Sequence, residues 1–109
     1  MAPTIPERDW KYIKKVKEEL LSALCKQING QAMDILKAEA NSERERYGRL
    51  YRHVQDSDGI VADCFDDWRR STLIMKLIAL QGHGLLTSDH MQNLSGETQK
   101  RLKALEEVE

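Results

Sequence analysis

Three neighbouring aspartates are the residues of this sequence best suited to chemistry. Asp63, Asp66 and Asp67 form a D-x-x-D-D cluster, and carboxylates on adjacent helical turns can share a magnesium ion that assists phosphate cleavage. The acidic residues that could complete such a site from a facing helix are Glu18, Glu19, Glu39 and Glu43. A structural role is the simpler interpretation, because Asp66 is spaced to pair with Arg69 and Arg70. We expect no metal or cofactor and keep a metal-dependent phosphohydrolase as an alternative function.

A group of arginines suggests a second alternative, a regulator that contacts nucleic acid. These residues, interleaved with Tyr47 and Tyr51, are Arg44, Arg46, Arg49 and Arg52. Basic side chains beside aromatic rings can bind phosphates and stack on bases. The net charge of the whole chain is −1, which disfavours a general electrostatic attraction to nucleic acid. We therefore expect a solvated helix face.

The remaining reactive residue types show no catalytic or metal-binding spacing. Cys25 and Cys64 each fall within an apolar helical pattern, which predicts two buried, reduced thiols. The segment Asp56-Ser57-Asp58-Gly59 resembles part of a calcium loop, but Val54 and Phe65 would occupy its first and twelfth positions, which need oxygen ligands. The three histidines have no partners at metal-ligand spacing. No catalytic residue is identified, so a protein without enzymatic activity is favoured.

Composition predicts a small helical protein. The 109 residues suffice for one domain, here 1–109, and include only two prolines and six glycines beside 40% hydrophobic and 32% charged residues. The longest apolar stretch is far shorter than the roughly 20 residues of a membrane-spanning helix. The N-terminus shows neither a basic nor an apolar signal region. We expect a cytoplasmic protein that is not bound to a membrane.

The first predicted helix covers about residues 9–40, with Asp9 as its cap. Its apolar residues recur at helical spacing, and they are Trp10, Ile13, Leu20, Leu24, Ile28, Ala32 and Ile35. This periodicity keeps its phase across Asn29-Gly30, so a continuous helix is favoured over a break there.

The second predicted helix covers residues 42–82. It begins at a capping box formed by Ser42 and Glu45. Its heptad face, expected to be an interface, consists of Tyr47, Tyr51, Val54, Asp58, Val61, Phe65 and Trp68, and continues through Thr72, Met75 and Ala79. Asp58 is a polar residue on this face, and a single polar residue there can fix the register of two helices.

Two shorter helices complete the predicted chain. Gly82 and Gly84 end the second helix, and Leu85 is placed to fold back on it. Thr87 caps a short helix over about residues 88–94, and Ser95 caps a last one over about 96–107.

The length of the second helix favours a homodimer. A helix over 42–82 would extend about 60 Å, whereas a compact chain of this size has a radius of gyration of about 13 Å. Either the helix breaks near Asp58-Gly59 or a second copy covers it, and the unbroken heptads favour the second copy. The sequence thus predicts an all-α bundle of two long antiparallel helices with one short and one medium C-terminal helix. Its expected function is that of a self-associating binding or structural module with a possible protein partner.

Overall fold

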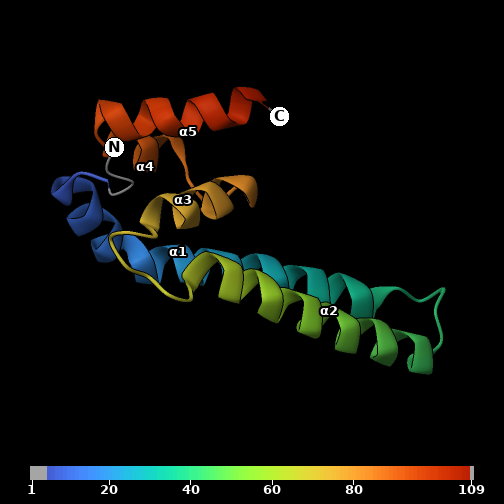
Figure 1. The fold of residues 1–109 in the computed structure, drawn as a ribbon. Coiled ribbons are helices and arrows are strands. Elements are labelled where there is room, and N and C mark those ends of the chain that lie inside the picture. The colour runs from blue at the N-terminus through green and yellow to red at the C-terminus, as the bar shows by residue number, and fades with distance from the viewer. Residues whose placement is uncertain (1–4, 109) are drawn as a thin grey trace.

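The computed structural model describes the backbone of residues 5–108 and the side chains of residues 5–104. Within this part the secondary structure is helical, without strands. Five helices follow one another along the chain: α1 (Glu7–Lys37), α2 (Glu43–Phe65), α3 (Leu73–Gly82), α4 (Ser88–Gln92) and α5 (Gly96–Val108) (Figure 1). This arrangement confirms the expected all-α fold with two long helices.

The two long helices form an arm. α1 and α2 lie side by side and antiparallel, joined by a turn at residues 38–42, while α3, α4 and α5 gather at the other end (Figure 1). The molecule measures 54 × 26 × 24 Å, and its radius of gyration is 16.7 Å. A compact chain of this length would have a radius near 13 Å. The outer half of the arm is therefore a two-helix projection.

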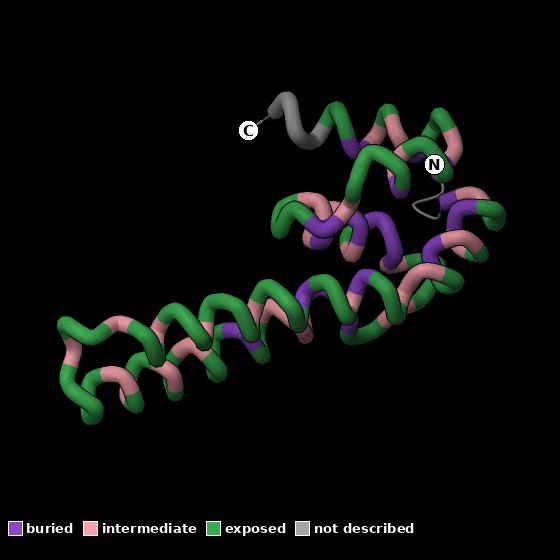
Figure 2. Tube along the Cα trace, turned by 180° about the vertical axis from the view of Figure 1, so that it is seen from behind, coloured by how far each residue is buried: buried purple, intermediate pink, exposed green. Residues whose placement is uncertain are grey.

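The hydrophobic core lies at the base of the arm, where α1 and α2 meet the three shorter helices (Figure 2). Its fully or nearly fully buried members are Ile5, Ile13, Leu20, Leu24, Cys64, Phe65, Leu73, Ile74, Leu77, Leu80, Leu85, Leu94 and Leu102. Towards the tip of the arm the helices are mostly exposed. Only the base therefore resembles the interior of a globular domain.

The first helix differs from its prediction at both ends. It begins at Glu7 after Pro6 and ends at Lys37, so the predicted range of 9–40 is slightly displaced. Asp9 does not cap it, because its carboxylate bonds to Ser95 instead. The helix continues through Asn29-Gly30, which confirms the continuous alternative.

The predicted continuous helix over 42–82 is wrong. α2 ends at Phe65, Asp66 is extended, and Asp67 has a positive φ of 57°, a conformation that aspartate tolerates better than most residues. The Thr72 hydroxyl donates to the Asp67 carbonyl oxygen at 2.7 Å and stabilises the turn. The turn lets α3 pack back on the base, where Leu73 and Leu77 are fully buried. Burial of this apolar segment outweighs the heptad continuity, so the helix breaks at 66–72 and not at Asp58-Gly59.

Three other helix boundaries predicted from local side-chain chemistry are correct. Ser42 and Glu45 form the expected capping box, with reciprocal bonds of 3.0 and 3.1 Å. Thr87 caps α4 through the His90 backbone N–H. After α3, Gly84 has a φ of 71°, and the Leu85 N–H donates to the Leu80 carbonyl at 2.9 Å, which is a glycine C-cap.

Candidate functional site

The three aspartates of the predicted metal site lie at the end of α2 and in the turn that follows. Asp63 is on the last helical turn, and Asp66 and Asp67 come after the helix. The Asp67 carboxylate binds Arg69 at 2.8 Å, and this hydrogen bond lowers the pKa of Asp67 and raises that of Arg69. Among the described residues there is no group of three or more His, Cys, Asp or Glu side chains that could hold a metal ion. The phosphohydrolase alternative gains no support from this arrangement.

The four arginines at the start of α2 do not act as one set. Arg46 is half-buried, donates to the Leu36 carbonyl oxygen at 3.1 Å, and binds Glu43 at 2.7 Å. Arg46 thus holds the end of α1 against the start of α2. The side chains of Arg44, Arg49 and Arg52 are exposed and give this part of the arm a basic surface.

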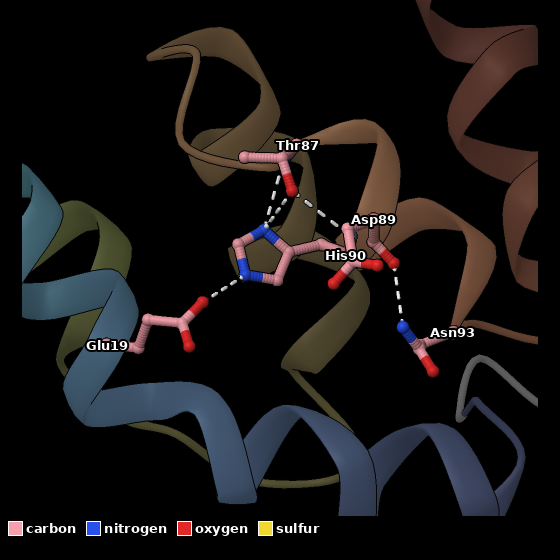
Figure 3. A network of polar contacts seen from close by, with 5 residues as sticks. All are labelled: Glu19, Thr87, Asp89, His90 and Asn93. Carbon is pink, nitrogen blue, oxygen red and sulfur yellow. Dashed lines mark hydrogen bonds and ion pairs between the residues drawn. The ribbon is translucent and has the colours of Figure 1, made fainter.

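A polar network joins α4 to α1 at the base (Figure 3). The imidazole of His90 is buried, and its Nε2 lies 2.7 Å from the Glu19 carboxylate. The His90 Nδ1 accepts the Thr87 backbone N–H at 3.0 Å, while the Thr87 hydroxyl accepts the His90 backbone N–H at 3.2 Å. Burial, together with the nearby Asp89 and Glu19 carboxylates, raises the pKa of Tyr12.

Thr87, His90 and Glu19 follow one another in the order of a catalytic triad of nucleophile, base and carboxylate. Their hydrogen bonds, however, are those of a helix cap. The Nδ1 lone pair of His90 is already occupied by the Thr87 N–H, so it is not a free base for the Thr87 hydroxyl. A cavity of about 510 Å³ lies between α3, α4 and α5, but its lining includes none of Glu19, Thr87 and His90. We interpret the network as a structural contact that holds α4 against α1.

A second buried polar group joins the two ends of the chain. Asp9 on α1 is completely buried, and its carboxylate accepts the Ser95 backbone N–H and hydroxyl, both at 2.7 Å, and the Thr98 hydroxyl at 2.5 Å. Its negative charge lies at the N-terminus of α5, where the helix dipole favours it. Sequence reasoning missed this contact because Asp9 and Ser95 are 86 positions apart, a separation that local spacing does not reveal.

The cysteine prediction is half correct. Cys64 is buried, and burial raises the pKa of its thiol, whereas Cys25 is exposed on α1. Both are free thiols. The apolar pattern at Cys25 belongs to the neighbouring Leu24, which is the residue that packs inward.

The outer arm exposes large hydrophobic side chains. Their exposed fractions are 71% for Tyr47, 57% for Tyr51, 48% for Val54, 54% for Met33 and 48% for Leu36. Exposed apolar residues scattered singly are ordinary, but a continuous group of them marks an interaction surface. Whether these five form one group depends on which sides of the two helices they occupy.

Helical geometry places the five residues on the same side of the arm. On α2 the residues turned towards α1 include Leu50 and His53, and the His53 Nε2 donates to the Ile28 carbonyl at 2.9 Å. Tyr51 and Val54 each follow one of these by one position, which is a rotation of about 100°. The α1 residues Met33 and Leu36 likewise follow the half-buried Ala32 and Ile35. Because the helices are antiparallel, the same rotation turns both sets towards one side. We call Met33, Leu36, Tyr47, Tyr51 and Val54 the arm patch.

The predicted heptad interface divides at the middle of α2. Tyr47, Tyr51, Val54 and Asp58 are exposed. Val61 and Trp68 are half-buried, and Phe65 is buried and stacked on Trp68 with ring centroids 5.8 Å apart. The Trp68 indole N–H donates to the Cys64 carbonyl at 2.7 Å, and the Lys17 ammonium lies 4.8 Å from the ring centroid. The heptad face from Val61 to Trp68 thus packs within the chain, whereas its first half is open to a partner and Met75, further along on α3, is 64% exposed.

Comparison of the chain with protein-family models, with curated proteins and with solved structures gave no match. None of the described helices is long and apolar enough to cross a membrane.

Proposed function

We propose that this protein is a self-associating helical module, in which two copies join through the arm. The observation that carries the proposal is the arm patch, in which Tyr47, Tyr51 and Val54 of α2 are about half exposed or more. Aromatic side chains with one polar end are typical anchors of protein interfaces. The stretch of the heptad face from Val61 to Trp68 packs inside the molecule, whereas the arm patch brings five large exposed hydrophobic side chains to one side of the arm.

The elongated shape supports the same proposal. Apolar burial stabilises the base of the arm, where the core lies, whereas the outer half consists of two helices with little apolar surface enclosed between them. A two-helix projection of this kind gains stability when a further helix packs on its exposed apolar side. A second copy supplies that layer with matched length, and a two-fold axis lets the same surface serve on both molecules.

The experiment compares Tyr51→Ser with Arg49→Ser by light scattering. Tyr51 belongs to the arm patch, and Arg49 is exposed on nearly the opposite side of α2, two positions and about 200° of rotation away. Tyr51→Ser is expected to weaken association at least tenfold, because truncation of an interface aromatic costs about 2 kcal/mol or more. Arg49→Ser should leave it within a factor of about three. Equal dimer populations in both variants would contradict the proposed interface.

A further inference from the structure

The two halves of α2, counted with its C-cap residue Asp66, carry opposite charge. Residues 43–54 contain four arginines and two glutamates, whereas residues 55–66 contain four aspartates and no lysine or arginine. The aspartates Asp56, Asp58, Asp63 and Asp66 are exposed, as are three of the arginines. An antiparallel neighbour with the same sequence would place its acidic half beside the basic half of α2. A parallel neighbour would place like charges together.

Two glycines of α2 have no explanation within the chain. A β-carbon at Gly48 or Gly59 would meet no atom within 4 Å. Glycine inside a helix is destabilising relative to alanine by about 0.5–1 kcal/mol, and neither residue has the positive φ that would require it. Small residues on a helix surface permit close approach of a second helix. Gly48 and Gly59 lie on the side of α2 turned away from Leu50 and His53, and Gly48 is one helical turn from Tyr51.

We infer that α2 pairs with α2 of a second copy, antiparallel, about a two-fold axis at Gln55. This inference rests on the proposed self-association and places the contact on the outward side of α2, where Tyr51 is the member of the arm patch that it buries. Counted from the exposed Gln55, Arg52 and Asp58 are three positions away on either side, and Arg44 and Asp66 are eleven away. Arg52 and Arg44 therefore lie opposite Asp58 and Asp66 of the second copy.

The same axis accounts for the glycines. Tyr51 and Gly59 are four positions from Gln55 on either side, and Gly48 and Ala62 are seven. The ring of Tyr51 thus lies over the Gly59 backbone of the second copy, and two small residues face each other at Gly48 and Ala62. Separations of three, four, seven and eleven are those that keep residues on one helix face. One register therefore pairs the charges and also covers the glycines.

Disulfide cross-linking tests this register. All variants carry Cys25→Ser to remove the exposed native thiol, whereas Cys64 is buried and is retained. Gln55→Cys, at the axis, should form a disulfide-linked dimer within minutes of mild oxidation. Arg44→Cys should not link to itself, because the two copies of residue 44 would lie about 33 Å apart along the helix at 1.5 Å per residue. Mixing Arg44→Cys with Asp66→Cys should give the mixed dimer.

Charge reversal gives an independent readout by light scattering. The double variant Arg44→Glu/Arg52→Glu should weaken association at least tenfold, because it places acidic residues opposite aspartates. Adding Asp58→Lys and Asp66→Lys to the same chain should restore affinity to within about threefold of the native protein. Circular dichroism checks that each variant keeps its helical content.

The outcomes separate the pairing from the proposed function. A native dimer in which Arg44→Cys links to itself, or in which charge reversal leaves association unchanged, overturns the antiparallel register and leaves self-association standing. A native protein that remains monomeric overturns both.

Discussion

Asp9 shows how a single side chain joins the two ends of the chain. It accepts three hydrogen bonds from Ser95 and Thr98 while completely excluded from water. A buried carboxylate is costly unless its oxygens are satisfied, and here each of them accepts at least one bond. The N-terminus of α5 is therefore held against α1 by one residue.

Removal of that carboxylate should be strongly destabilising. Asp9→Ala removes the acceptor of three hydrogen bonds, one of them from the buried Thr98 hydroxyl, and we expect a loss of about 3 kcal/mol in the free energy of unfolding, measured in urea. Glu7→Ala, two residues away and exposed, is the control and should change it by less than about 0.5 kcal/mol. A similar, small effect of both substitutions would show that the Asp9 contacts contribute little.

Glu45 makes a pH-dependent contribution at the start of α2. Hydrogen bonds from the Ser42 backbone N–H and hydroxyl lower the pKa of Glu45 below its ordinary value of 4.5. The group thus stabilises the folded state at pH above 4.5, and this stabilisation is lost as the pH falls through the lower folded pKa. Glu45→Gln should reduce the difference in urea midpoint between neutral and acidic solution. An unchanged difference would contradict a role for the ionised cap.

Residues whose contacts are local were predictable, and those with distant partners were not. Ser42, Thr87 and Gly84 act within five residues of their own position, so their spacing in the sequence reveals the cap. Asp9 and His90 bond to partners 86 and 71 positions away. Nothing in their own neighbourhood distinguishes these two residues from ordinary polar surface positions.

Among the helices, α2 departs most from the expected pattern. Its heptads continue into residues 66–72 in the sequence, yet the chain turns there and α3 packs on the base. A periodic pattern states which residues share a face but not how far one helix extends, because that depends on tertiary burial. The face itself also has two roles, since Phe65 is buried within the chain while Tyr51 is exposed.

The helix glycines provide a test that separates folding from association. Gly59→Ala should raise the stability of the monomer by about 0.5–1 kcal/mol, because its β-carbon meets nothing in the chain and alanine favours helix. The same β-carbon would obstruct a closely packed second helix, so the dimer dissociation constant should rise.

Gly30→Ala is the matched control. Gly30 is an open position in the interior of α1 and lies outside the proposed pairing of α2 with α2, so Gly30→Ala should gain similar stability with unchanged association. A Gly59→Ala variant that is both more stable and equally dimeric would argue against close approach of helices at this point.

Considered as a whole, the molecule is a small helical base that carries a two-helix arm. The base contains the core and the buried polar contacts of Asp9 and His90, whereas the arm contains the exposed apolar patch and the divided charge of α2. The sequence predicted two long antiparallel helices, which the structure confirms, although α2 ends at Phe65. The extension comes from α1 and α2 lying side by side, and not from one helix over 42–82.

The most direct measurement of self-association is the mass of the native protein by sedimentation equilibrium, over concentrations from low micromolar to near-millimolar. The chain mass is 12.6 kDa. Association through the arm predicts that the measured mass rises with concentration and levels off at twice that value, since a two-fold interface closes at two copies. A mass that stays at 12.6 kDa over the whole range would contradict the proposed function.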